Sequence, residues 1–153
     1  MKINYLISPL LVLITAVTGS LITSQNMDWY RTLQLPSFTP EGKTIALVWM
    51  GLFILQAIAL LITQRRSSAW RFAFCFAIFL GTCVLNVYWS YLFFGQHNLS
   101  SAIWEAGILT ASILFLAIVI WPVSRLASLL LWPYIAWTGF ATFLTYSVWY
   151  LNH

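Results

Sequence analysis

Charged residues are scarce in this chain. Only 7% of its 153 residues are charged, with three Asp/Glu against seven Lys/Arg, whereas soluble domains carry roughly 25%. A soluble protein of this size covers its surface largely with charged side chains. The composition therefore argues against a water-soluble enzyme, a nucleic-acid-binding protein and a disordered tail.

Motifs of well-known catalytic and metal chemistry are also absent. The sequence has no HExxH, no CxxC pair, no P-loop, no GxGxxG and no nucleophile elbow. We therefore expect no catalytic residue, no metal site and no required cofactor. The two cysteines, Cys75 and Cys83, would lie about 12 Å apart along one helix, which is too far for a disulfide.

Apolar sequence is what the chain has in excess, at 61% of its residues. A helix needs roughly 20 apolar residues to cross a bilayer, and backbone groups in lipid must be bonded within the segment. Five segments meet this length: 3–23, 44–63, 70–94, 101–122 and 126–150. We predict an all-α integral membrane protein, a five-helix bundle forming one domain over 1–153, with a loop at 24–43.

The first segment has a second interpretation. Lys2, the apolar run after it and the small residues at 15–20 are typical of a signal peptide.

Basic residues are distributed unequally between the two sides of such a bundle. One side carries basic residues only: Lys2, Arg65, Arg66, Arg71 and Arg125. The other side has two basic and two acidic residues: Arg31, Lys43, Asp28 and Glu41. The positive-inside rule predicts a cytoplasmic N-terminus, with the loop 24–43 and the C-terminus outside. Because the basic residues lie at the ends of apolar segments, they indicate the orientation in the membrane and not the binding of a nucleic acid.

Few polar side chains fall inside the predicted helices. Asn86 and Gln56 are either interhelical hydrogen-bonding residues or, for Asn86 above all, functional residues. Glu105 is either a functional carboxylate or a helix N-terminal acid favoured by the macrodipole.

Nine tryptophans are a large excess. Most fall near the predicted membrane interfaces, but Trp49, Trp89 and Trp137 lie at least one turn inside. An indole N–H at that depth needs a partner. Trp49 and Trp89 share the depth of Asn86, which predicts an aromatic pocket with polar groups; the alternative is ordinary aromatic packing.

The loop 24–43 contains Trp29, Tyr30 and the stretch from Leu35 to Pro40. Its two prolines stiffen the backbone, so the loop could cover the pocket as a lid. His97 is a candidate haem ligand or, alternatively, a solvated loop residue.

Several separated motifs resemble the TspO/translocator protein family. They are Trp29-Tyr30-x-x-Leu33-x-x-Pro36-Ser37-Phe38-Thr39-Pro40, Val48-Trp49, Leu85-Asn86-x-x-Trp89, Phe93-Phe94-Gly95, Glu105, and Pro133-Tyr134-x-x-Trp137-x-x-Phe140-Ala141-Thr142. The resemblance covers about residues 3–152 and argues against the signal-peptide interpretation. Two family positions differ, because Phe38 replaces a tryptophan and Glu41 a proline, and the family's sterol motif is incomplete near the C-terminus.

The resemblance implies a membrane protein, often a homodimer, that binds porphyrins in a pocket under the first loop. Family pocket positions correspond to Tyr30, Pro40, Trp49, Asn86, Ser90, Trp137, Ala141 and Leu144; we add Trp89 from its depth. The short uncharged C-terminus resembles bacterial members, so we expect the bacterial cell membrane, with the outer membrane as the alternative.

We therefore expect a receptor or sensor that binds protoporphyrin IX or haem and regulates tetrapyrrole levels. A tetrapyrrole transporter and a light-dependent porphyrin-degrading enzyme are the alternatives. Arg31 and Lys43 are candidate partners for the ligand's propionates, unless they only pair with Asp28 and Glu41. The expected partners are thus a hydrophobic small molecule and the lipid bilayer.

Overall fold

The computed structural model describes residues 6–153, and most of these residues are helical, with no strand among them. Five helical spans are long and apolar enough to cross a membrane: Ile7–Gln25, Gly42–Arg66, Ala69–Gly95, Leu99–Ile120 and Arg125–Leu151. The predicted five-helix membrane bundle is confirmed. The part of the first segment at residues 3–5 lies outside the described residues.

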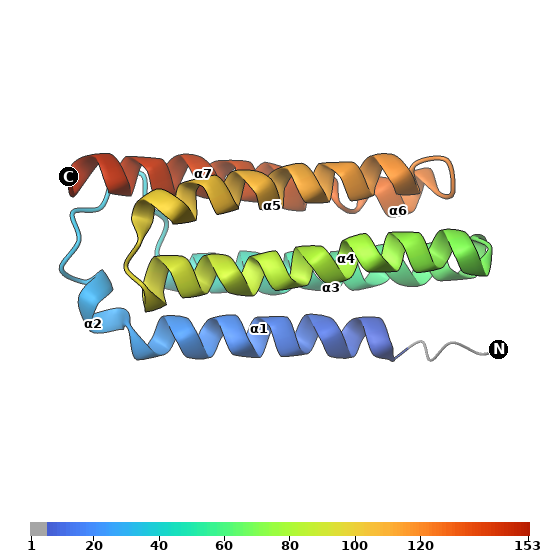
Figure 1. The fold of residues 1–153 in the computed structure, drawn as a ribbon, viewed down its shortest axis with the longest axis horizontal. Helices are drawn as coiled ribbons and strands as arrows, with labels where there is room; N and C mark the ends of the chain where they lie inside the picture. The colour runs from blue at the N-terminus through green and yellow to red at the C-terminus, as the bar shows by residue number, and fades with distance from the viewer. Residues whose placement is uncertain (1–5) are drawn as a thin grey trace.

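The spans run side by side along one axis, and the start of α1 and the C-terminus lie at opposite ends (Figure 1). α5 (Leu99–Ile120) packs on α7 (Trp132–Leu151) and on α4 (Ala69–Ser90), while α1 (Ile7–Gln25) packs on α4 and on α3 (Gly42–Arg66). We call the end with the C-terminus and residues 26–41 the loop end. The opposite end, with Arg65, Arg66, Arg71 and Arg125, is the arginine end.

Proline divides the last span. The single helix expected over 126–150 is interrupted: α6 (Arg125–Leu129) ends and α7 begins at Trp132, with Pro133 in its first turn. A proline ring clashes with the carbonyl four residues earlier, and that residue here is Leu129. The helix therefore has to stop at Leu129 and restart.

A π-helical turn ends the third span. η1 (Tyr91–Gly95) continues α4, and the amide of Gln96 donates to the carbonyl of Tyr91 at 2.8 Å. The chain then reverses through His97, which has a φ of 53°. Asn98 caps α5, because its side chain accepts from the Ser101 amide at 3.0 Å. Single π turns inside α-helices often mark functional sites.

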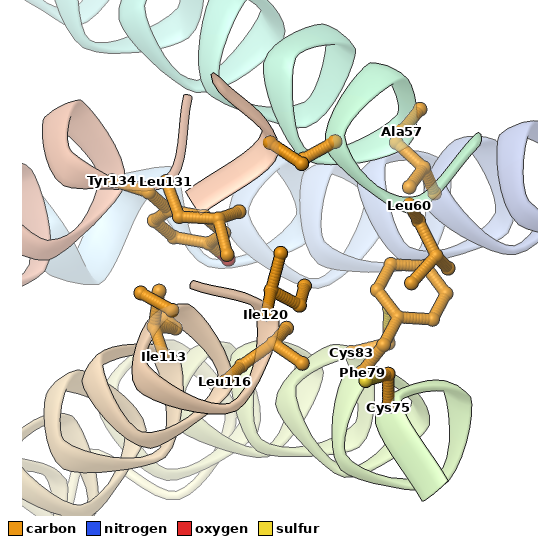
Figure 2. Packing of buried hydrophobic residues seen from close by; sticks show 14 of the residues in the cluster. Ala57, Leu60, Cys75, Phe79, Cys83, Ile113, Leu116, Ile120, Leu131 and Tyr134 are labelled. Atoms are coloured by element: carbon orange, nitrogen blue, oxygen red, sulfur yellow. The ribbon is translucent and has the colours of Figure 1, made fainter. Parts of the chain in front are cut away.

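A large apolar cluster fills the middle of the bundle and its arginine end. We call it the central cluster, and Figure 2 labels these members: Ala57, Leu60, Cys75, Phe79, Cys83, Ile113, Leu116, Ile120, Leu131 and Tyr134. Both cysteines are buried, and neither forms a disulfide. The loop-end cluster is smaller and consists of Leu92, Phe93, Phe94, Leu99, Ala102 and Val148.

Polar side chains join the helices inside the central region. The Gln56 amide nitrogen donates to the Thr82 hydroxyl at 3.0 Å, from α3 to α4. Both residues are buried. Gln56 thus has the interhelical role that its position allows.

Candidate ligand-binding site

A small pocket lies between the central cluster and the loop-end cluster. Four helices line it, with these residues: Trp49, Asn86, Trp89, Ala106, Leu109, Thr138 and Ala141. The Trp49 ring packs against the central cluster and the Trp89 ring against the loop-end cluster. The free space for a water-sized sphere is about 10 Å³, which is about the room that one water molecule needs.

Asn86, which lines the pocket, forms a hydrogen-bonded pair with Tyr134 behind it. The Asn86 side chain donates to the Tyr134 hydroxyl at 3.1 Å, and Asn86 and Tyr134 are only 7% and 1% exposed. The Tyr134 ring lies edge-on to Trp49, with ring centres 5.8 Å apart and planes at 90°. This pair ties α4 to α7 and holds one wall of the pocket in place.

Several buried polar atoms near the pocket have no hydrogen-bonding partner within residues 6–153. They include the indole nitrogens of Trp89 and Trp137 and both carboxyl oxygens of Glu105. Buried polar groups are nearly always paired, so each unpaired one calls for an explanation. A polar ligand or water reaching this region would find donors and an acceptor already oriented by the packing.

Glu105 does not owe its position to the start of its helix. α5 begins at Leu99 and has no acid in its first turn, so Glu105 lies beyond the amides that the macrodipole alternative requires. Its side chain is buried at 4% exposure. The helix-terminal explanation therefore loses its basis.

Aromatic rings close the loop end above the pocket. Trp89 stacks on Phe93 of η1 at 5.1 Å, and the Trp29 ring lies edge-on to Phe93 at 5.9 Å. Tyr30 contacts Phe94 at 5.5 Å. Burial raises the pKa of the Tyr30 phenol, so this hydroxyl stays protonated at neutral pH and remains a hydrogen-bond donor. The aromatic side chains of α2 (Met27–Tyr30) thus cover the loop-end cluster.

The rest of the loop is fastened to α7. The Gln34 amide donates to the Asn152 side-chain oxygen at 2.9 Å, and the Asn152 amide nitrogen donates back to the Gln34 carbonyl at 3.0 Å. Phe38 stacks on Phe143, with ring centres 5.5 Å apart. Gln34 and Asn152, which are 118 positions apart in the chain, thereby fix the loop against α7.

We expect loss of this clamp to free the loop. Asn152→Ala removes both hydrogen bonds to Gln34, and the Gln34 amide should exchange with solvent deuterium about tenfold faster. Asn152→Asp keeps the acceptor but not the donor, so its exchange should be intermediate. Exchange mass spectrometry in detergent measures both, and an unchanged rate in Asn152→Ala would contradict the clamp.

The predicted site residues are brought together only in part. Trp49, Asn86, Trp89 and Ala141 line the pocket itself. Tyr30 and Leu144 pack in and around the loop-end cluster. Trp137 packs against Phe140 at 5.5 Å beside the central cluster. These last three surround the pocket without lining it.

Other predicted residues lie farther from the pocket lining. The Ser90 hydroxyl lies 3.4 Å from where a Cβ of Gly19 would be, so it faces α1. Pro40 is half-buried in the loop, and Arg31 and Lys43 are exposed. Arg31 pairs with Asp28 at 3.4 Å.

His97, the candidate haem ligand, stacks on Trp29 with ring centres 4.0 Å apart. Among residues 6–153, no group of three His, Cys, Asp or Glu side chains could hold a metal ion.

Four residues that contribute to the site were not predicted from the sequence: Tyr134, Ala106, Leu109 and Thr138. Tyr134 belongs to a family motif, but nothing in the sequence places its hydroxyl beside Asn86. The side chain of Ala106 carries no functional group that would mark it in the sequence.

These features define a polytopic membrane protein with an aromatic pocket, lined by a few polar groups, beneath a fastened loop. Residues 8–151 match the model of the TspO/MBR family, and the chain belongs to that family.

Named relatives cover most of the chain. The membrane protein YtaB of Bacillus subtilis is 34% identical over 80% of this chain and 79% of its own length. The tryptophan-rich protein TspO of Bacillus cereus is 31% identical over 88% of this chain and 87% of its own length. The translocator protein of Homo sapiens is 27% identical over 90% of this chain and 82% of its own length.

Proposed function

We propose that the protein is a membrane receptor that binds a porphyrin, protoporphyrin IX or haem, in the pocket between the two clusters and so regulates tetrapyrrole levels. The observation that carries this is the set of aromatic walls, Trp49 and Trp89, beside the polar Asn86. Such walls suit a flat apolar ring, and a buried amide beside them orients it. The porphyrin class comes from the family resemblance.

The pocket has to widen for such a ligand, because its free space of about 10 Å³ is far too small. The outer part of α3 supplies the movement: none of the residues Gly42–Met50 is buried. Displacing this end separates Trp49 from the Phe53 and Tyr134 rings, but it breaks few other packing contacts because the rest of the segment is not buried. Segments with few buried contacts open at low free energy.

A titration tests the proposal. Purified protein in detergent is mixed with protoporphyrin IX or haem, and tryptophan fluorescence and porphyrin absorbance are followed. We expect saturable quenching by a receptor. Absence of saturation contradicts the proposal, a protein-dependent product under illumination favours degradation, and counterflow in proteoliposomes favours transport.

Arg31 and Lys43 are our proposed partners for the two propionates, which are costly to bury unpaired. We expect the double variant Arg31→Gln/Lys43→Gln to bind protoporphyrin IX several-fold more weakly, with a smaller salt dependence. The dimethyl ester of the same porphyrin carries no charge and should bind the variant as it binds the parent. An equal loss for acid and ester would show that the loop had been disturbed instead.

We propose that the arginine end is cytoplasmic and that the loop end lies outside the bacterial cell membrane, because basic side chains gather at the former. Single cysteines at position 34 or 66, in a background lacking Cys75 and Cys83, can be probed with an impermeant thiol reagent on intact cells. We expect labelling at 34 only. Labelling at 66 but not at 34 would reverse the orientation.

We also propose a homodimer. Ala73, Ala77 and Gly81 form an exposed stripe of small residues on α4, and such stripes allow close helix contact. Sedimentation of the protein–detergent complex should give the mass of two chains, and the mass of one chain would contradict the dimer.

A further inference from the structure

A hollow of about 460 Å³ opens at the arginine end, far from the candidate pocket. It lies between the last residue of α3, Arg66, and the turn that joins α5 to α6. In Figure 1 this turn is at the end of the bundle opposite the C-terminus. The volume is in the range of small-molecule sites.

Two arginines stand in the walls of this hollow, Arg66 and Arg125, and both are exposed. The chain has only three acids. Asp28 and Glu41 belong to the loop end, and Glu105 is in the loop-end half of α5. No carboxylate therefore compensates the two guanidinium groups, and the hollow attracts an anion.

A tryptophan positions one of these guanidinium groups. The central carbon of the Arg125 guanidinium is 5.8 Å from the centre of the Trp121 ring, within the range of a cation–π interaction. This contact holds the planar group at the mouth of the hollow. A guanidinium oriented in this way binds phosphate oxygens with two parallel hydrogen bonds.

The surroundings of the hollow are apolar. Pro122 and Leu126 line it, and the exposed side chains of Leu126, Leu129 and Trp132 continue the apolar surface along α6 and α7. A free inorganic anion would gain nothing from these side chains. A molecule with a phosphate at one end and acyl chains at the other matches both parts of the surface.

We propose that this hollow binds the headgroup phosphate of an anionic phospholipid from the adjoining leaflet, with Arg66 and Arg125 on the phosphate and the acyl chains along α6 and α7. Basic pockets between membrane helices are known to hold anionic headgroups. This site is separate from the porphyrin pocket, because the central cluster lies between them.

Native mass spectrometry of the full chain in detergent tests the site with two phospholipids, phosphatidylglycerol and phosphatidylcholine, of equal chain length. We expect tighter binding of phosphatidylglycerol. Arg66→Gln and Arg125→Gln should each weaken it at least threefold and should weaken phosphatidylcholine less, because its choline neutralises the phosphate. Arg71→Gln is the matched control, since Arg71 is exposed at the same end but does not line the hollow.

Lysine variants keep the test informative if a glutamine variant does not fold. Arg66→Lys and Arg125→Lys retain the charge but lose the paired hydrogen bonds, so intermediate affinity is expected. Equal binding of the two lipids, or an equal loss in Arg71→Gln, would overturn the site. Competition by glycerol phosphate at the same concentration as the lipid would also overturn it, because the hollow would then recognise phosphate alone.

Discussion

Trp49→Ala is expected to weaken protoporphyrin IX binding about tenfold or more. Trp49 forms one wall of the pocket. An aromatic wall stacked on a ligand ring contributes roughly 0.5–1.5 kcal/mol beyond the apolar area that it buries, and 1.4 kcal/mol corresponds to a factor of ten. Its removal should also lower stability, by up to about 3 kcal/mol, because the half-buried Trp49 ring packs against Phe53 and Tyr134.

Porphyrin absorbance is the measurement of choice here, since the substitution also alters tryptophan fluorescence. Trp70→Ala is the matched control: Trp70 is 83% exposed at the start of α4, near the arginine end, and its loss should leave affinity unchanged. Unchanged affinity in Trp49→Ala would show that the ligand does not enter between Trp49 and Trp89.

Asn86→Ala should also weaken binding, and its cost in stability has a different cause from that of Trp49→Ala. Asn86 donates to the Tyr134 hydroxyl, so the substitution removes the partner of a buried group, which costs about 1–3 kcal/mol. Affinity measured for this variant has to be compared at a temperature where both proteins remain folded. The structure thus adds a structural role to a residue that the sequence analysis considered as a binding residue.

Tyr134→Ala is expected to have the largest effect on stability, about 3–5 kcal/mol. Tyr134 is 1% exposed, and its ring packs edge-on against Trp49 and against Phe53, with centres 5.8 Å and 6.3 Å away. The cavity left by alanine would face both aromatic rings. Thermal unfolding in detergent measures the loss.

Two further variants separate the ring of Tyr134 from its hydroxyl. Tyr134→Phe keeps the packing and leaves only the Asn86 side chain without its acceptor, so the cost should be about 1–3 kcal/mol. Tyr150→Ala on the same helix removes a side chain that is 69% exposed and should cost little. If Tyr134→Phe were as destabilising as Tyr134→Ala, the hydrogen bond and not the ring packing would hold the helices together.

The five membrane helices could be predicted from the sequence because the physical requirement is local. A segment in lipid has to be long, apolar and internally hydrogen-bonded, and each of the five segments meets these conditions by itself. A local cause also explains why the helix restarts near Pro133. The proline ring would clash with the Leu129 carbonyl in a continuous helix. The single helix expected over 126–150 is therefore corrected to α6 and α7.

The composition of the pocket was decided by the tertiary structure. Helical periodicity gives the depth of Trp49, Asn86 and Trp89, but rotation about the helix axis decides which neighbour each side chain meets. Ser90, a single residue before the π turn, faces Gly19 and not the pocket.

Contacts between distant segments were likewise decided by the tertiary structure. The Asn86–Tyr134 hydrogen bond joins residues 48 positions apart, and the Asn152–Gln34 clamp joins residues 118 apart. An amide side chain can satisfy its hydrogen bonds with many partners, and only the packing of α5 on α4 and α7, together with the closure of the loop onto α7, selects these. Sequence thus determined that the chain spans the membrane five times, whereas packing determined which of its polar and aromatic side chains form a site.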